Sequence, residues 1–290
     1  MATLTSTTLA VPGGELTYDV RPNDSSTELP LLLIGSPMAA AGFVTLASYF
    51  QDRSVVTYDP RGSERSSKDD PSEPSTPEDH AGDLFRIIQA LNGGPLDVFA
   101  SSGGAVNALA LVARHPGVVR TLVAHEPPLA ALLPDRDQAL AAVRAVRDSY
   151  QARGWGAGMA HFIAIVGHKG PMTADVVAQP GPDPEMFGMP SEDDGNRTDV
   201  MFGQNLITCT HFEPDLEALR GSSTRIVVAA GEESEGEMAY RGALALAEAL
   251  GQDPVIFPSN HGGFLGGEYG QTGDPDAFAV KLRTVLADEA

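Results

Sequence analysis

The chain has 290 residues, a hydrophobic fraction of 42% and a formal net charge of −20, with 19 basic and 39 acidic residues. Nucleic-acid binding needs a basic face, so we expect no nucleic-acid partner, and no apolar run is long enough to span a membrane. A single cysteine, Cys209, excludes an internal disulfide and fits a reducing compartment. The amino-terminal MATLTSTTLAVPGG lacks a basic start and an apolar signal-peptide core, and we therefore expect a cytoplasmic protein.

Strand and helix patterns alternate along the first part of the chain. The segment 76–93, for example, predicts a helix, because Thr76 can cap it and apolar side chains recur at helical spacing from Leu84 to Leu91. The predicted elements are a hairpin over 7–20, strands over 29–35, 54–60, 95–101 and 118–126, and helices over 76–93 and 104–115. Repeated strand–helix–strand units predict an α/β fold with a mostly parallel sheet and helices on both faces.

The alternation stops near Pro134 and resumes near Thr224. Between these positions the apolar spacing is helical, and a loop rich in proline, glycine and acidic residues covers 169–195. Later elements are strands over 224–231 and 253–259 and helices over 237–250 and 275–288. We therefore expect one large core domain with an inserted helical cap. Its parts are the first part of the core over 1–133, the cap over 134–215 and the second part of the core over 216–290.

The segment ASSGG (100–104) has the form small–x–Ser–x–small between a predicted strand and a predicted helix. This context favours a nucleophile elbow, in which a sharp turn raises a serine hydroxyl above the sheet. Ala100 stands where glycine is commoner, and Gly104 supplies the second small position. The alternative is that Ser101 or Ser102 only caps the following helix. We predict that Ser102 is a catalytic nucleophile.

A serine hydroxyl needs a base at neutral pH, and seven histidines are candidates. His261 lies in a glycine-containing loop after the last predicted strand, and this chain order fits a Ser–His pair. His125 is the main rival, but His125 and Glu126 are neighbours on a strand, point to opposite faces and should not both enter one site. Structural positions are expected for His80, His115, His161, His168 and His211. We predict that His261 is the base.

Three glutamates compete for the role of the acid that orients the imidazole. In the loop after the strand 224–231, the usual aspartate position is Ser234, and Glu232 and Glu233 lie just before it. Glu126 instead ends a strand that a right-handed crossover places beside the strand of the nucleophile, so it would emerge at the same edge of the sheet. We predict that Glu126 is the acid, with Glu232 or Glu233 as the alternative.

A developing oxyanion needs two N–H donors. One is predicted at Gly103, directly after the nucleophile. The other is predicted in the loop IGSPMAAAGF (34–43), where Ser36 is the first choice and Met38 the second, because proline has no N–H. A plain strand-to-helix loop explains that segment equally well. Three cap aromatics are candidates for the lining of an apolar substrate pocket and equally for the core of the cap: Trp155, Phe162 and Phe202.

These segments together resemble the α/β-hydrolase superfamily over nearly the whole chain. DPRGSERSS (59–67) is similar to the Asp-x-Arg-Gly-x-Gly-x-Ser loop of the family, with Glu64 in place of the second glycine. Because that loop is structural in the family, the departure has little bearing on the chemistry. The family's His-Gly oxyanion motif is replaced here by Ile34-Gly35.

Two further segments, SSGG (101–104) and HEPP (125–128), resemble the branch of the superfamily that carries its acid after the sixth strand. The lactonases that open the macrocyclic lactone zearalenone belong to this branch. The resemblance implies a triad of Ser102, Glu126 and His261. Haloalkane dehalogenases share the acid position but use an aspartate nucleophile, so Ser102 argues against dehalogenation and against epoxide hydrolysis.

No metal-ligand spacing is present and GGFLGG (262–267) fits no nucleotide-binding pattern, so we expect neither a metal nor a cofactor. We predict a cofactor-independent serine hydrolase that cleaves a carboxylic ester or lactone, such as a bulky or macrocyclic lactone like zearalenone, through an acyl-enzyme. The alternatives are a cofactor-free perhydrolase or haloperoxidase with the same triad, and a ligand-binding protein of the same fold with little turnover. The expected partner is a small-molecule ester or lactone, and a homodimer is a possible assembly.

Overall fold

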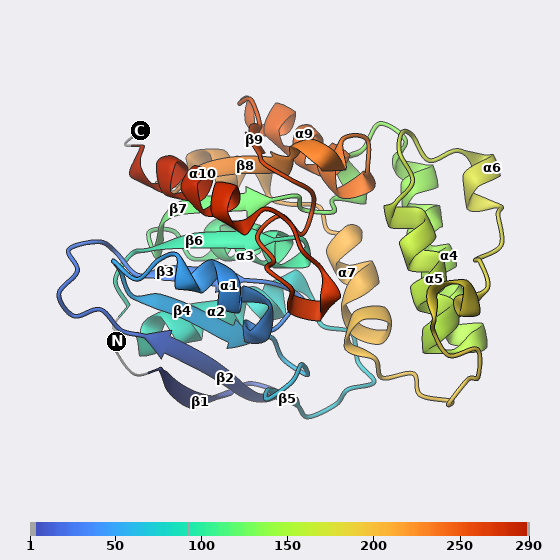
Figure 1. The fold of residues 1–290 in the computed structure, drawn as a ribbon, viewed down its shortest axis with the longest axis horizontal. Helices are drawn as coiled ribbons and strands as arrows, with labels where there is room; N and C mark the ends of the chain where they lie inside the picture. The colour runs from blue at the N-terminus through green and yellow to red at the C-terminus, as the bar shows by residue number, and fades with distance from the viewer. Residues whose placement is uncertain (1–3, 92, 289–290) are drawn as a thin grey trace.

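The computed structural model describes residues 4–91 and 93–288, and the strands of this part form one sheet (Figure 1). The strands lie in the order β1-β2-β4-β3-β6-β7-β8-β9, and the short β5 pairs with β2. Their bounds are β1 (Thr5–Val11), β2 (Gly14–Arg21), β3 (Leu31–Ile34), β4 (Val55–Asp59), β5 (Ser67–Lys68), β6 (Leu96–Ser101), β7 (Val119–His125), β8 (Arg225–Gly231) and β9 (Val255–Phe257).

Most of the sheet is parallel. Each neighbouring pair from β4 through β3, β6, β7 and β8 to β9 is parallel, whereas β1 and β2 form the predicted antiparallel hairpin and β2 pairs antiparallel with β4. The central strands β3 and β6 are buried along their whole length, which explains why β3 is wholly apolar and why Val98, Phe99 and Ala100 follow one another in β6 without polar residues between them. Parallel strands bring their carboxyl ends to one edge of the sheet, and this edge carries the residues discussed below.

Helices cover both faces of the sheet. One face is covered by α2 (Pro77–Ala90), α3 (Gly103–Arg114) and α9 (Met238–Leu250), and the other by α1 (Val44–Ser48) and α10 (Pro275–Ala287). The helix α2 begins where the sequence predicts, because the Thr76 hydroxyl accepts a hydrogen bond from the Asp79 N–H at 3.1 Å. The predicted α/β class with a mostly parallel sheet and helices on both faces is confirmed.

The chain between β7 and β8 is helical and stands at one end of the sheet (Figure 1). Its helices are α4 (Arg136–Arg153), α5 (Trp155–Val166), α6 (Ala174–Val177), α7 (Leu206–Thr210) and α8 (Leu216–Gly221). In the view of Figure 1, α7 lies between the α4–α5 pair and the sheet. Side chains of α4, α5 and α7 form a separate apolar cluster, whereas Leu219 of α8 is buried in the cluster of α2 and α3.

Six short helical turns complete the chain. They are η1 (Ala40–Phe43), η2 (Ala130–Leu132), η3 (Pro184–Phe187), the π-helical η4 (Val200–Asn205), η5 (Glu232–Ser234) and η6 (Glu268–Gly270) within the described residues. An ion pair between Asp135 and Arg241 joins the start of the inserted segment to α9. Asp135 also accepts the Met172 N–H at 2.6 Å, and Arg241 donates to the Gly170 carbonyl at 2.9 Å. These bonds fix the helical insertion against the core.

Candidate active site

Ser102 lies on a sharp turn between β6 and α3. Its backbone has φ 58° and ψ −130°, a region that a residue with a side chain adopts only where the surrounding structure enforces it. A Cβ atom at Gly103 would lie 2.6 Å from the Ser36 carbonyl oxygen, and one at Gly104 would lie 2.6 Å from the Ile34 carbonyl oxygen. Both positions therefore need glycine, because the end of β3 passes directly against the turn.

The structure separates the two serines of the segment. Ser101 is the last residue of β6, and its hydroxyl lies 3.2 Å from His125 Nδ1. Ser102 occupies the position before α3, but its side chain makes no capping hydrogen bond. Within residues 4–91 and 93–288, the Ser102 hydroxyl makes no hydrogen bond at all, including none to His261. Ser102 is therefore not held as a helix cap, and its hydroxyl is available to a ligand.

Glu126 and His261 form a hydrogen-bonded ion pair at the same edge of the sheet. Glu126 follows the last residue of β7 and is fully buried, and His261 Nδ1 bonds to its Oε2. The other carboxylate oxygen accepts the Gly231 N–H at 2.8 Å, and the Glu126 N–H donates to the Ala229 carbonyl at 2.9 Å. Because Nδ1 faces the carboxylate, the tautomer with hydrogen on Nδ1 leaves Nε2 as a proton acceptor.

Glu126 and His261 each stabilise the charged form of the other. The pKa of Glu126 is about 2, because the hydrogen bond from His261 and the Gly231 N–H outweigh the opposing effect of burial. Burial also opposes the charged form of His261, but the hydrogen bond and the charge of Glu126 raise its pKa above the ordinary value of 6.5. About 40% of the His261 side chain is exposed, so the imidazole is accessible from outside.

The rival acids lie elsewhere. Glu232 and Glu233 are exposed in η5, and the Glu233 backbone N–H, not its side chain, contacts the next loop through the Ser259 carbonyl at 3.0 Å. Ser234, at the position where an aspartate is usual, is buried and its hydroxyl has no hydrogen-bond partner among the described residues. Of the three predicted glutamates, Glu126 is the one whose carboxylate bonds to His261.

Backbone contacts connect the serine turn to this pair. The Ser102 N–H donates to the His125 carbonyl at 2.9 Å, and Glu126 is the next residue along the chain. The ring of His125 lies 6.1 Å from the ring of His261 between centroids. The His125 ring packs among Phe264 and Phe278 and bonds to the Ser101 hydroxyl, whereas the Glu126 carboxylate bonds to His261. Ser102, Glu126 and His261 are thus gathered where β6, β7 and β9 end.

The predicted oxyanion donors also lie together. Gly103 is the first residue of α3, so its N–H has no intrahelical acceptor. The Ser36 carbonyl oxygen is the nearest atom to a Cβ built at Gly103, which places the loop of Ser36 beside the serine turn. Ser36 is buried and precedes a cis peptide bond to Pro37. Met38, the second choice, is partly buried and packs against Gly35. A Cβ atom added at Gly35 would lie 2.7 Å from the Cβ of Met38.

Of the three aromatics suggested for a substrate pocket, Phe202 lies in the apolar cluster of the helical insertion. It is 1% exposed, and its ring lies 5.4 Å from Tyr150 and 6.3 Å from Phe162. Of the two roles expected for Phe202, lining a pocket or packing in a core, its burial favours packing: it lies against the other helices of the insertion and has almost no free surface. Phe162 is partly buried against the same cluster, and Trp155 is 37% exposed at the start of α5.

Two residues near the site were not predicted from the sequence. Cys209 Sγ of α7 lies 3.4 Å from a Cβ built at Gly103 and 3.9 Å from Asn107 Oδ1, so α7 of the helical insertion contacts α3 there. Glu237, at the start of α9, has a raised pKa because burial and the charge of Glu126 both disfavour its ionised form. No local pattern marks either residue, because both depend on how distant helices meet the sheet edge.

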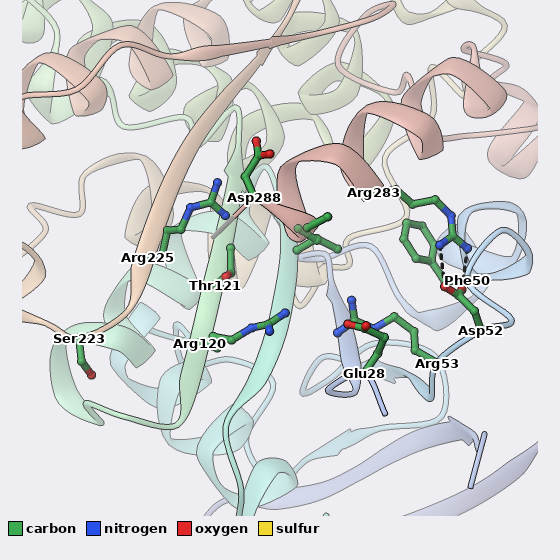
Figure 2. A pocket seen from close by; sticks show the side chains of 12 residues that line it. Glu28, Phe50, Asp52, Arg53, Arg120, Thr121, Ser223, Arg225, Arg283 and Asp288 are labelled. Carbon is green, nitrogen blue, oxygen red and sulfur yellow. Dashed lines mark hydrogen bonds and ion pairs between the residues drawn. The ribbon is translucent and has the colours of Figure 1, made fainter. Parts of the chain in front are cut away.

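A cavity of about 610 Å³ lies at the opposite, amino-terminal edge of the sheet (Figure 2). Figure 2 shows several arginines around it, from the starts of β7 and β8 and from α10. Their charges are engaged: Arg53 and Arg120 pair with Asp97, and Arg283 pairs with Asp52. This cavity is therefore separate from Ser102 and His261, which lie at the carboxyl ends of the strands.

Neither a metal centre nor a membrane span is found in the described part of the chain. Among residues 4–91 and 93–288, no three His, Cys, Asp or Glu side chains are grouped so that they could hold a metal ion. In the same residues no helix combines the length and the apolar character needed to cross a membrane.

Comparison with known proteins gives a family match to part of the chain and a relative similar over most of it. The family model of the alpha/beta hydrolase fold matches residues 31–154. The uncharacterized hydrolase YraK of Bacillus subtilis (strain 168) is 29% identical over 269 residues, which cover 90% of this chain and 91% of YraK.

Solved structures are similar over the same extent. A thermophilic esterase from Thermogutta terrifontis matches with a TM-score of 0.66 and 19% identity, covering 98% of each chain. The enol-lactonase from Burkholderia xenovorans LB400 matches with a TM-score of 0.63 and 18% identity, covering 97% of this chain and 100% of the lactonase. At such identities the likeness establishes the fold, and the predicted fold with its parallel sheet is confirmed.

Proposed function

This chain belongs to the α/β-hydrolase superfamily, and on that premise we propose that it is a serine hydrolase that cleaves a carboxylic ester or lactone without a cofactor. Ser102 is the nucleophile, His261 the general base and acid, and Glu126 the acid that orients the imidazole. The Gly103 and Ser36 N–H groups form the oxyanion hole. The likeness to an esterase and to an enol-lactonase supports this substrate class.

The reaction proceeds in two halves. Ser102 Oγ attacks the carbonyl carbon, and His261 Nε2 takes the hydroxyl proton as the new carbon–oxygen bond forms. The tetrahedral intermediate then expels the alkoxide, which takes this proton from His261 and leaves an acyl group on Ser102. In the second half a water molecule gives a proton to His261 and attacks the acyl-enzyme, and Ser102 recovers the proton as the free acid leaves. With a lactone, the alcohol stays joined to the acyl group after the first half, so acid and alcohol leave as one molecule at the end.

The observation that carries this proposal is the environment of Glu126. A buried carboxylate has one oxygen on a backbone N–H and the other on an imidazole that is itself accessible. Such a carboxylate holds the ring in one orientation and stabilises the imidazolium that forms during attack. The Ser102 hydroxyl lies on the strained turn beside it, and in sites without a ligand the serine–histidine bond is commonly long and shortens when substrate binds.

Replacement of the serine tests the proposal. We expect Ser102→Ala to lower turnover of p-nitrophenyl esters by about 10⁴-fold or more while the protein keeps its unfolding temperature. Ser223→Ala, at an exposed position near the opposite edge, is the matched control and should keep full activity. A Ser102→Ala variant with wild-type turnover would overturn the assignment.

A substrate screen sharpens the class. The wild-type protein and Ser102→Ala are compared on short and long p-nitrophenyl esters and on small and macrocyclic lactones, including zearalenone. Turnover that depends on Ser102 with any of these supports the proposal and identifies the size of the acyl group. Peroxide-dependent halogenation in acetate buffer as the main activity would instead assign the same residues to the perhydrolase alternative. No turnover and no labelling of the serine would favour a ligand-binding protein.

A further inference from the structure

His125 is a buried histidine that the proposed reaction does not use. It is the last residue of β7, it is fully buried, and it pairs with Ser101 in the register of β6 and β7. Its Nδ1 lies 3.2 Å from the Ser101 hydroxyl, and its carbonyl accepts the Ser102 N–H at 2.9 Å. One residue therefore holds both serines of the turn, the first through its ring and the second through its backbone.

Four phenylalanine rings enclose the imidazole of His125. The centroid distances are 5.9 Å to Phe99, 6.0 Å to Phe257, 6.4 Å to Phe264 and 5.4 Å to Phe278. Phe264 and Phe278 lie nearly perpendicular to the imidazole, at 87° and 78°. Among the described residues His125 Nε2 is buried and has no polar partner. The His125 imidazole therefore has a polar contact at Nδ1 and only aromatic surroundings at Nε2; the four phenylalanine rings are called the box below.

The surroundings decide which nitrogen of His125 carries the hydrogen. If Nε2 is protonated, its N–H can point at an aromatic face, and the bare Nδ1 accepts the Ser101 O–H. If Nδ1 is protonated, the bare Nε2 lone pair is buried among phenyl rings, with no N–H or O–H donor to satisfy it. The neutral Nε2–H tautomer therefore satisfies both nitrogens, and the other does not.

The charge state of His125 bears on the neighbouring pair. Burial lowers the pKa of His125 to about 4, so the ring is neutral near neutral pH. Its ring lies 6.1 Å from that of His261, and Glu126 is the next residue. A charged His125 would be a second cation beside Glu126 and would compete with His261 for the carboxylate. A neutral ring leaves the carboxylate to His261.

We propose that His125 is a positioning residue of the proposed hydrolase, which as a neutral Nε2–H imidazole fixes Ser101 through Nδ1 and Ser102 through its carbonyl. The inference rests on the proposed function of Ser102, because its kinetic consequence is a correctly placed nucleophile. A histidine that only fills space in the apolar cluster would be replaceable by phenylalanine without effect on turnover. The positioning role requires the hydrogen-bond acceptor at Nδ1.

Two substitutions separate these roles. His125→Phe keeps an aromatic ring in the box but removes the acceptor, whereas His125→Asn provides an oxygen near the position of Nδ1. We expect His125→Phe to lower kcat about 10-fold with KM changed less than about twofold, and His125→Asn to recover most of that loss, because small displacements of a nucleophile are costly. A folded His125→Phe protein with wild-type kcat would overturn the proposal.

Removal of the hydrogen-bond donor provides the second kinetic test, which also serves if His125→Phe fails to fold. Ser101→Ala deletes the hydroxyl and leaves His125 in place, so kcat should fall in the same direction, by about threefold, with KM unchanged. The His125→Phe and Ser101→Ala losses should not add when combined, because both break the same contact. Wild-type kcat in Ser101→Ala would contradict the role of this contact.

A spectroscopic test does not depend on turnover. Nitrogen NMR of protein labelled with ¹⁵N-histidine identifies the His125 signals as those lost in His125→Asn. We expect the shifts of a neutral Nε2–H tautomer that stay constant from about pH 5.5 to pH 8.5. A Nδ1–H tautomer, or a titration within that range, would overturn the inference. If Ser102→Ala shows that the proposed function is wrong, this measurement still decides the state of His125.

Discussion

Two buried carboxylates lie at opposite edges of the same sheet, and their partners differ. Asp97 lies near the start of β6 and is bonded by the guanidinium groups of Arg53 and Arg120. Glu126 follows the end of β7 and is bonded by the Gly231 N–H and the His261 imidazole. A guanidinium group stays charged at every relevant pH, whereas an imidazole gains and loses its proton near neutrality. The carboxylate of Asp97 with its arginines can therefore only stabilise the structure, whereas the Glu126–His261 pair can take part in proton transfer.

The comparison also explains the location of the proposed site. At the amino edge, the arginines around the cavity of Figure 2 are already engaged by carboxylates or carbonyl oxygens. At the carboxyl edge, a strained serine, an exposed imidazole and a helix amino terminus meet. Burial of a carboxylate alone does not identify a catalytic acid. We propose Glu126 as the acid because its partner is titratable and because it lies at the carboxyl edge of the sheet.

Among the charged residues of the two edges, the largest effect is expected from Glu126 at the carboxyl edge. Glu126→Gln keeps the shape of the side chain but removes the charge that stabilises the imidazolium, so kcat should fall by about 10³- to 10⁴-fold. The measurement is steady-state hydrolysis of a p-nitrophenyl ester. Glu233→Gln is the matched control at an exposed position. If Glu233→Gln loses more activity than Glu126→Gln, the acid is misassigned.

The matching substitution at the amino edge should affect stability and not catalysis. Asp97→Asn leaves two guanidinium groups without their carboxylate, and breaking a buried pair costs about 3–5 kcal/mol of unfolding free energy. Urea unfolding measures this loss, and kcat of the folded variant should stay within about twofold of wild type. A large fall in kcat at unchanged stability would break the contrast between the two edges.

The dependence on pH follows from the pKa shifts at the carboxyl edge. His261 acts as a base only when neutral, so kcat/KM should fall as the pH drops through its raised pKa, which lies above 6.5. In Glu126→Gln the carboxylate charge is absent, the pKa of His261 falls, and the acidic limb of the profile moves to lower pH. An acidic limb that does not move would show that Glu126 has no influence on the base.

The unfolding free energy should also depend on pH through His261 and Glu126. The raised pKa of His261 stabilises the folded protein fully below 6.5, and this contribution is lost as the pH rises through the folded value. The lowered pKa of Glu126 stabilises it above 4.5, and this is lost as the pH falls toward about 2. The difference in unfolding free energy between wild type and Glu126→Gln is therefore greatest between about pH 4.5 and 6.5. Urea unfolding across this range checks it.

The smallest effect is expected at the half-exposed ion pair of the amino edge. The Arg283 and Asp52 side chains are 41% and 51% exposed, so solvent screens their attraction. Arg283→Met should lower the unfolding free energy by at most about 1 kcal/mol and leave kcat unchanged. A loss as large as that of Asp97→Asn would show that burial does not separate the two arginine pairs.

The fold, and the places of Ser102, Glu126 and His261 within it, could be predicted because local patterns indicate them. Apolar runs without alternation indicate buried parallel strands, as in β3 and in Val98–Ala100 of β6, and the Thr76 cap indicates the start of α2. The small residues around Ser102 reflect the close approach of β3 to the turn. The position of Glu126 followed from the handedness of one crossover, and its bond to His261 agrees with that reasoning.

Other features could not be predicted, because they depend on contacts between distant segments. The apolar spacing around Phe202 is the same whether the ring lines a pocket or fills the cap, and only the packing against Tyr150 decides. The approach of Cys209 to Gly103 depends on how the cap meets the core. The bond between Ser101 and His125 depends on the register of β6 and β7, which no single segment specifies.

The most direct test of the central claim is to identify the residue that a fluorophosphonate modifies. Only an activated serine reacts at a useful rate, so mass spectrometry of the digested adduct locates the nucleophile. We expect one adduct, on Ser102, which forms quickly in the wild-type protein and far more slowly in Glu126→Gln. An adduct on Ser101 or on another serine, or no adduct under conditions that label a known serine esterase, would contradict the claim.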